Sequence, residues 1–348
     1  MFEQVGRTQQ TTKTKEFIAK TILDACQKNG FTTKEKAQKF VKEVLSELEG
    51  TNEERLANAE LENLADLMKE PIRTMKFSGL SSGFPEFDKF SMGFKLGEVV
   101  IMGGYPHKGK STMMMRWCFE FAKQGVDVAY FPFDDDSEYF KGRAQLMANG
   151  EKIDLSTTEG RIMMFPKEFQ PFFYDDKKNL VTAIRVIKKT MPNCQVVVVD
   201  MLNSILDTVN DKDANSFTST LQAVAEEVGI CLFLICRLRE PAGLTQKARD
   251  KQSVDPDINA IYGDSRTAYV ASKVITLSGT LNRNKQAMKG FSQIEKQYIG
   301  LHIPKCRGGL VTNGGGEDGA NVEIIYELCR TRDSMKINEV GVEEVQLP

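Results

Sequence analysis

A glycine-rich segment, GGYPHKGKST, carries the clearest chemical signal in the chain. Its residues match the pattern G-x-x-x-x-G-K-[ST], in which glycines let backbone N–H groups wrap around phosphates. The lysine then neutralises the β- and γ-phosphates, and the hydroxyl of the next residue is a ligand for Mg²⁺. The segment therefore predicts a site for ATP and Mg²⁺, with Ser111 as a metal ligand. The residues expected to line this site are Gly104, Tyr105, Pro106, His107, Lys108, Gly109, Lys110, Ser111 and Thr112.

A second chemical signal is a carboxylate at the end of the apolar run VVVVD, which is Asp200. In an open α/β sheet, ligands gather at the carboxyl ends of the strands, where a carboxylate can hold Mg²⁺. An isolated aspartate at this position is more often a helix cap. Its combination with the glycine-rich loop favours a metal role for Asp200.

Three acids, Asp134, Asp135 and Asp136, follow another apolar run in VDVAYFPFDDDSEY. One carboxylate here could polarise the water that attacks the γ-phosphate, as a general base. The alternative is a solvated acidic loop in which Asp136 or Ser137 caps the next helix. Three adjacent acids cannot all be catalytic, so at least two of them are expected to fill the second role.

The elements that position these residues form an alternating pattern of short apolar strands and amphipathic helices. Such alternation predicts an α/β domain with a mainly parallel sheet that is covered on both faces. The strands are expected at Val99–Met102, Val126–Phe131, Val196–Val199, Cys231–Cys236, Val274–Leu277 and Gly300–Ile303. The intervening helices are expected at Ser111–Lys123, Leu180–Thr190 and Phe217–Val228. The strand and the helix that flank the glycine-rich loop argue against a chance glycine turn.

The two ends of the chain differ from this central part in their pattern of apolar and charged residues. Helical spacing of apolar residues, interrupted at Gly30, Gly50 and Pro71, predicts a helical appendage and linker over residues 1–76. The α/β domain then covers residues 77–333, and Val322–Cys329 alternates like an edge strand. Because Glu339, Glu343 and Glu344 gather in residues 334–348, we expect an acidic tail outside the core.

Composition excludes several classes of protein. Lys and Arg total 46 against 48 Asp and Glu, so any nucleic-acid surface must be local. The seven cysteines form no C-x-x-C pair, and two histidines are too few for a histidine-built metal site. No run approaches 18 apolar residues and the N-terminus has no apolar signal region, which predicts a cytoplasmic protein without a membrane partner. For a phage-encoded chain that compartment is the host cytoplasm.

These motifs together resemble the RecA-fold motors of ring-shaped replicative helicases, DnaB and its phage primase-helicase relatives. The resemblance runs from about Ser78 to Arg332 and opens with LSSGFPEFDKFSMGFKLGEVVIMGG. It implies a RecA-like P-loop fold, with Asp134 in the place of the family's catalytic glutamate. VVVVDMLNSI is similar to the Walker B segment and supports Asp200. No cysteine-pair zinc finger or other primase signature is present, so a fused primase is not expected.

Two later segments extend the resemblance. CLFLICRLREP is similar to the segment that ends in a γ-phosphate sensor, a position that Arg237 occupies here. IGLHIPKCRGG is similar to the late strand followed by K-x-R, which implies that Lys305 and Arg307 reach the neighbouring subunit's γ-phosphate. An arginine finger of this type stabilises charge in the transition state. In isolation, both residues could also be ordinary charges at a strand end.

A long polar segment, Pro241–Arg266, has the features of a nucleic-acid contact. It lacks apolar periodicity, and a loop of this length in a compact domain is usually functional or disordered. By the resemblance it lines a central channel and holds single-stranded DNA through its phosphates. Four acids dilute its charge, so a solvated surface loop is the alternative. The expected DNA contacts are Lys247, Arg249, Lys251 and Arg266. Residues 208–216 are a weaker candidate for a second channel loop.

The resulting expectation is an ATP-driven 5′-to-3′ DNA helicase that assembles as a ring, hexameric by the resemblance, with ATP at subunit interfaces. The N-terminal helices are expected to bind an adjacent subunit, a primase or a helicase loader, or to complete the ring. One alternative is a RecA-like recombinase or recombination mediator that forms filaments on single-stranded DNA. Another is a non-enzymatic assembly protein that uses ATP only to stabilise its oligomer.

Overall fold

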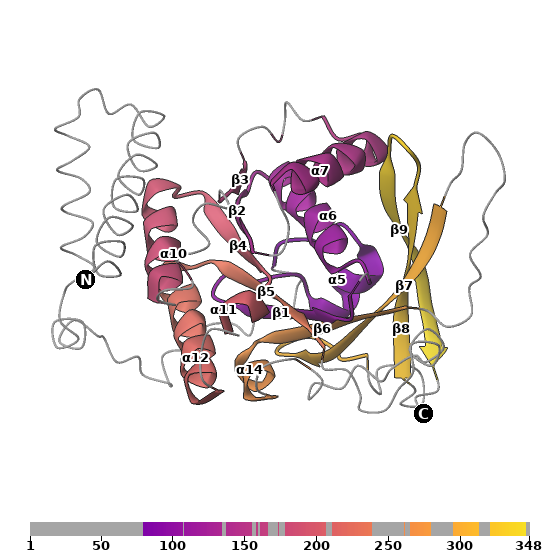
Figure 1. Cartoon of the computed structure of the whole chain (residues 1–348). Coiled ribbons are helices and arrows are strands. Elements are labelled where there is room, and N and C mark those ends of the chain that lie inside the picture. The colour runs from indigo at the N-terminus through magenta and orange to yellow at the C-terminus, as the bar shows by residue number, and fades with distance from the viewer. Residues whose placement is uncertain are drawn as a thin grey trace, which may run out of the picture. The chain divides into compact units, whose positions relative to one another are not determined.

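The described part of this computed structural model is built around one sheet of nine strands, in the order β3-β2-β4-β5-β1-β6-β7-β8-β9 (Figure 1). The described residues are 79–106, 108–133, 137–154, 158, 161–165, 173, 178–206, 211–238, 261, 265–279, 295–312 and 321–345. The helical appendage expected in residues 1–76 lies outside these ranges. None of the helices within them is long and apolar enough to cross a membrane.

The sheet has a parallel half and an antiparallel half. Strands β3, β2, β4, β5, β1 and β6 pair in parallel, whereas β6, β7, β8 and β9 pair antiparallel. The predicted α/β class with a mainly parallel sheet is confirmed. The strands are β1 Val99–Gly104, β2 Asp127–Pro132, β3 Ile162–Met164, β4 Cys194–Asp200, β5 Cys231–Arg237, β6 Lys273–Gly279, β7 Glu295–Cys306, β8 Asn321–Arg330 and β9 Met335–Val345.

Helices cover both faces of the parallel half. Side chains of α5, α6 and α7 join one buried apolar cluster with Val100, Met102 and Tyr130 of the sheet. Helix α12 packs against β1 and β5 from the other side, since its buried residues lie outside that cluster. The helices are α5 Pro85–Ser91, α6 Lys110–Lys123, α7 Ser137–Glu151, α10 Lys178–Thr190, α11 Asn203–Leu206, α12 Asp211–Val228 and α14 Ser265–Val270.

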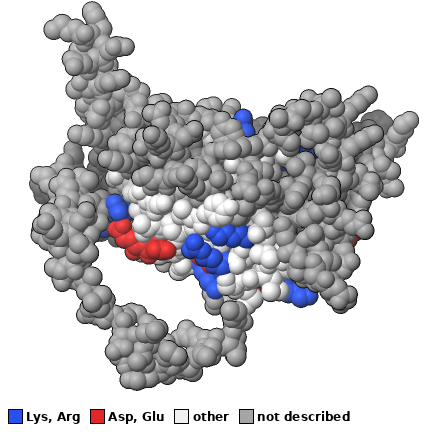
Figure 2. All heavy atoms as spheres, turned by 90° about the horizontal axis from the view of Figure 1, so that it is seen from below, with Lys and Arg blue, Asp and Glu red and all other residues white. Residues whose placement is uncertain are grey.

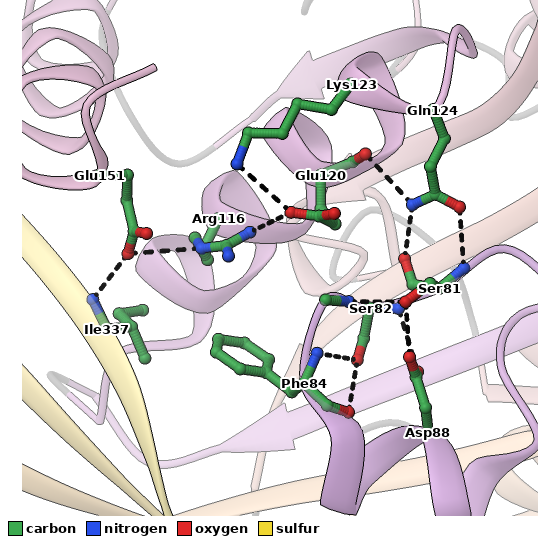
Figure 3. Close-up of polar contacts among 11 residues, drawn as sticks. Ser81, Ser82, Phe84, Asp88, Arg116, Glu120, Lys123, Gln124, Glu151 and Ile337 are labelled. Atoms are coloured by element: carbon green, nitrogen blue, oxygen red, sulfur yellow. Dashed lines mark hydrogen bonds and ion pairs between the residues drawn. The ribbon is translucent and has the colours of Figure 1, made fainter.

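Aromatic contacts from the segment before β1 hold α6 in place, and polar contacts fix the shape of that segment. Trp117 of α6 is fully buried, with ring centroids 5.1 Å from Phe87 and 5.0 Å from Phe94. Asp88 accepts hydrogen bonds from the Ser81 hydroxyl, at 2.6 Å, and from the Ser82 N–H (Figure 3). Aromatic pairs of this kind stabilise a fold beyond the area that they bury. Phe87 and Phe94 therefore hold the helix that follows the glycine-rich loop.

A buried ion pair connects α6 to α7 and β9. Arg116 of α6 bonds Glu120 on its own helix at 2.9 Å and contacts Glu151, at the end of α7, at 3.3 Å (Figure 3). The same Glu151 carboxylate accepts the N–H of Ile337 in β9. Because one guanidinium joins two carboxylates in the interior, α7 and β9 have a fixed position relative to α6.

The structure contradicts three expectations: an acidic tail after residue 333, an edge strand at Val322–Cys329 and a second channel loop at residues 208–216. Residues 335–345 form β9 rather than a tail outside the core, because Met335 and Ile337 alternate into the apolar cluster. Strand β8 is therefore an interior strand, not the edge. Asp211–Ser216, placed in a second channel loop, belongs to α12, and residues 207–210 lie outside the described ranges.

Candidate nucleotide-binding site

The glycine-rich loop connects the end of β1 to the start of α6, as the spacing predicted. Gly109 has φ 84°, a left-handed conformation that glycine adopts without strain. A Cβ on Gly109 would also lie 2.8 Å from Cδ1 of Ile299. A Cβ on Gly104 would lie 3.1 Å from Cγ of Lys110. Both glycines thus leave room for side chains packed around the start of α6, whose N–H groups favour anions.

Lys110 begins α6 and stays close to the loop. Its Nζ donates a hydrogen bond of 3.0 Å to the Tyr105 carbonyl. The first turn of α6 holds no acidic residue, so its positive end is not neutralised locally. His107 lies outside the described residues.

Asp200 ends β4 and is 5% exposed. Its carboxylate accepts a hydrogen bond of 2.5 Å from the hydroxyl of Tyr130 in β2. Burial raises the pKa of Tyr130 well above its usual value, and the negative charge of Asp200 raises it further. Tyr130 is therefore a neutral donor that orients the Asp200 carboxylate, a contact that sequence reasoning did not find.

Arg237 ends β5, and its backbone pairs in register with Gly104. Its N–H donates a hydrogen bond of 2.8 Å to Oδ1 of Asn203 in α11. The side chain of Arg237 is exposed and lines the same cavity as Lys110 and Ser111. Asp134, the candidate general base, lies outside the described residues.

These side chains share a cavity of about 970 Å³. Lys110, Ser111, Asp200 and Arg237 line it together. A hydroxyl and a carboxylate oxygen are ligands that suit Mg²⁺, which in such sites also binds substrate phosphates. The donor set therefore fits Mg²⁺ and a nucleoside triphosphate.

The remaining walls of the cavity come from elements that the motifs did not point to. One face of α7 contributes residues at i, i+3, i+4 and i+7, counted from Tyr139. This helical spacing is the sequence signal that could have identified them. The Arg143 guanidinium lies 4.8 Å from the centre of the Tyr139 ring, which is 59% exposed. These α7 residues are Tyr139, Gly142, Arg143 and Leu146, with Glu138 and Gln145 beside them, and the antiparallel strands add Gln297, Leu328, Arg330 and Met335.

Lys305 and Arg307 lie at the opposite end of the sheet from the glycine-rich loop. The Arg307 N–H bonds the Ser272 carbonyl, and the Ser272 N–H bonds the carbonyl of Val99 at the start of β1. The loop follows Gly104, five residues further along, which is about 16 Å at the rise of a β-strand. An arginine side chain cannot span that distance, so Arg307 cannot serve the nucleotide of its own subunit.

The ammonium of Lys305 is bonded within its own subunit. It donates to the carbonyl of Ala268, at 3.1 Å, and to the carbonyl of Tyr269, both in the last turn of α14. Burial lowers the pKa of Lys305, and the nearby charge of Arg307 lowers it further. The side chain of Arg307 itself is exposed.

The candidate DNA contacts fall mostly outside the described residues. Lys247, Arg249 and Lys251 lie outside the described residues, and Arg266 is described only as a backbone position in α14. In the face seen in Figure 2, a small group of Lys and Arg side chains lies near a group of Asp and Glu.

Comparison with known proteins points to one family. The family model described as "DnaB-like helicase C terminal domain" matches residues 79–259, which contain the glycine-rich loop, Asp134, Asp200 and Arg237. The matched range ends before Lys305 and Arg307.

Curated relatives and a solved structure agree with this match. The chain is 31% identical over 107 residues to "Replicative DNA helicase DnaB" of Helicobacter pylori (strain ATCC 700392 / 26695), covering 30% of this chain and 22% of that protein. It is 25% identical over 215 residues to "Probable replicative DNA helicase" of Trieres chinensis, covering 54% of this chain and 47% of that protein. The matches thus span between about a fifth and a half of these relatives. A solved structure described as an ATPase domain has a similar fold, with a TM-score of 0.50 at 14% identity over 80% of this chain and 95% of that one.

Proposed function

The chain belongs to the family of DnaB-like helicase C-terminal domains, and we propose that it is an ATP-dependent DNA helicase that translocates on single-stranded DNA as a ring-shaped oligomer. The observation that carries the proposal is the cavity in which Lys110, Ser111 and Asp200 meet. A phosphate-binding lysine, a hydroxyl and a strand-end carboxylate in one cavity are the parts that phosphoryl transfer requires.

Each side chain then has a distinct task during hydrolysis. Lys110 and the N–H groups at the start of α6 bind the β- and γ-phosphates. Ser111 and Asp200 would hold Mg²⁺, which when bound neutralises charge on the phosphate oxygens. Asp134 orients the attacking water and accepts its proton, and Arg237 contacts the γ-phosphate from the adjacent strand.

Arg307 supports an oligomeric site. Because β1 rises by about 16 Å between the strand end near Arg307 and the glycine-rich loop of the same chain, Arg307 would stabilise transition-state charge on a nucleotide held by another subunit. A head-to-tail contact of this kind generates a closed ring or an open filament. The DnaB-like match favours the ring, which we propose is hexameric, and the recombinase-like filament is the second candidate.

The remaining contacts follow from the same proposal. Lys247, Arg249, Lys251 and Arg266 would hold phosphates of single-stranded DNA, without reading its sequence. The helices of residues 1–76 would contact a neighbouring subunit, a primase or a helicase loader.

A substitution pair tests the nucleotide site. Lys110→Ala should lose ATP turnover by on the order of 100-fold, because phosphate charge is no longer neutralised. Lys123→Ala removes a lysine from the other end of the same helix, where it pairs with Glu120, and should keep wild-type turnover. Asp134→Asn should bind ATP but lose turnover, whereas Asp136→Asn should be mild. Wild-type ATPase activity in Lys110→Ala would contradict the proposed function.

Electron microscopy separates the two assemblies. Negative-stain images with ATP and single-stranded DNA should show closed rings. Helical filaments along the DNA would favour the recombinase instead, even with an intact ATPase.

A further inference from the structure

The walls of the nucleotide cavity come from two groups of elements, which suit different parts of a nucleotide. The start of α6 supplies Lys110 and Ser111, whose side chains suit the phosphates. Helix α7 and the adjoining ends of β8 and β9 supply Leu146, Leu328 and Met335. With the phosphates at α6, the nucleoside would lie against this second group. The distance of α7 and β9 from the start of α6 therefore decides how well the whole nucleotide fits.

The end of α7 and the start of β9 form one unit, the α7–β9 wall. A Cβ on Gly150 would overlap the carbonyl oxygen of Met335, so the two backbones touch where these residues meet. The next residue, Glu151, accepts the N–H of Ile337 at 3.0 Å. Gly150 is about one helical turn from Leu146, so this contact adjoins the cavity. A shift of α7 would therefore carry the start of β9 with it.

Arg116 connects the α7–β9 wall to α6 (Figure 3). Its guanidinium contacts Glu151 at 3.3 Å and bonds Glu120 of its own helix at 2.9 Å. The side chains of Arg116 and Glu151 are only 8% and 7% exposed, so salt and water screen their attraction little. Arg116 follows Lys110, the first residue of α6, by six positions, which is about 9 Å along the helix. It is thus set back from the phosphate-binding turn and would act on a nucleotide through the wall.

The two carboxylates that contact Arg116 differ in what they join. Glu120 lies one turn further along α6, so its bond to Arg116 connects residues of the same helix. Glu151 belongs to α7 and also holds the backbone of β9. Only the second contact ties α6 to another element, although both remove a similar charge when they are replaced.

We propose that Arg116 is a positioning residue for nucleotide binding, which holds the α7–β9 wall at the right distance from the phosphate-binding turn through Glu151. The inference rests on the proposed function, because it needs a nucleotide in the cavity. If the contact is lost, the wall shifts and its contacts with the nucleoside loosen, while Lys110 and Ser111 still hold the phosphates. The loss then falls on nucleotide binding rather than on the chemical step.

The test measures the dissociation constant of ADP by calorimetry, together with KM and kcat for ATP, in matched variants of the full chain. Glu151→Gln removes the charge that Arg116 contacts but keeps an oxygen that can accept the Ile337 N–H. It should weaken ADP binding and raise KM by on the order of tenfold, with kcat close to wild type. Glu120→Gln is the matched control and should keep wild-type affinity, because that contact lies within α6.

A double variant shows whether the two residues act as one unit. Arg116→Met should weaken ADP binding as much as Glu151→Gln does. The variant that combines both changes should bind ADP no more weakly than either alone, because each removes the same contact. Thermal unfolding checks that every variant folds, and the two Gln variants carry the test if Arg116→Met does not.

The possible outcomes distinguish this inference from the proposed function. Wild-type ADP affinity in Glu151→Gln overturns the inference alone. Equal weakening in Glu120→Gln also overturns it, because a general effect of lost charge would then explain both variants. A lower kcat at an unchanged KM overturns it too, since the contact would then act on the chemical step. Failure of the wild-type protein to bind ADP overturns the proposed function.

Discussion

The hydroxyl of Tyr130 donates a hydrogen bond of 2.5 Å to the carboxylate of Asp200, across the paired strands β2 and β4. Both side chains are buried, so this contact fixes the orientation of the carboxylate before any ligand arrives. The candidate metal ligand is therefore held by a residue 70 positions away in sequence.

Tyr130→Phe should raise the Mg²⁺ concentration needed for half-maximal ATP turnover by about tenfold, because the donor that orients Asp200 is lost. A titration of ATPase activity with Mg²⁺ measures the effect. Tyr326→Phe is the matched control, since Tyr326 is also buried and also donates to a carboxylate, that of Glu339, on another part of the sheet. An equal Mg²⁺ requirement in wild type and Tyr130→Phe would show that Asp200 does not depend on this contact.

Replacement of Lys247, Arg249 and Lys251 by Gln should weaken binding of single-stranded DNA and make it less sensitive to salt. Each lost phosphate contact lowers the slope of log K against log salt by about 0.7. The control replaces Lys89, Lys123 and Lys141, each of which lies near a glutamate of its own helix. Fluorescence anisotropy at several salt concentrations gives both slopes. The same slope for both triple variants would place the DNA site elsewhere.

Glu339 of β9 should make the folded state less stable as the pH rises through its pKa. Burial raises the pKa of Glu339 above its usual 4.5, so the native state binds the proton more tightly than the unfolded chain. That contribution to the free energy of unfolding is present below about pH 4.5 and is lost as the pH rises through the higher, native pKa. Burial also raises the pKa of Asp88, but Asp88 is present in both wild type and Glu339→Gln, so its contribution cancels when the two are compared.

Urea unfolding of wild type and Glu339→Gln between pH 4 and 7 tests this sign, over roughly the range where carboxyl groups titrate. The stability of wild type relative to the variant should fall with rising pH. Glu343→Gln, an exposed change on the same strand, controls for the loss of charge alone. A relative stability that rises with pH would mean that the hydrogen bonds from the Glu86 and Phe87 N–H groups outweigh burial.

The parts of the fold that sequence could predict are those that a few consecutive residues encode. The apolar runs before Gly104 and through Asp200 predicted β1 and β4, because strands covered on both faces read as continuous apolar segments. The glycine-rich loop was predictable for the same reason, since Gly109 satisfies a local backbone requirement.

What sequence could not predict depends on contacts between distant segments. The acidic residues near the end of the chain indicated a solvated tail, but Glu339 instead accepts the first N–H groups of α5, about 250 positions earlier. The α7 wall of the cavity and the Lys305 contact with α14 are of the same kind. No local sequence pattern predicts these contacts, because each residue has no distinctive feature within its own segment.

Mixing two inactive variants tests most directly whether Arg307 of one subunit completes the nucleotide site of another. Arg307→Ala subunits keep an intact glycine-rich loop, and Lys110→Ala subunits keep an intact Arg307. In an equal mixture, about a quarter of head-to-tail interfaces would pair the two intact parts. DNA-stimulated ATPase activity is the readout, with mixed oligomers confirmed by mass. We expect partial recovery of activity, whereas no recovery in confirmed mixed oligomers would contradict a role of Arg307 in the neighbour's site.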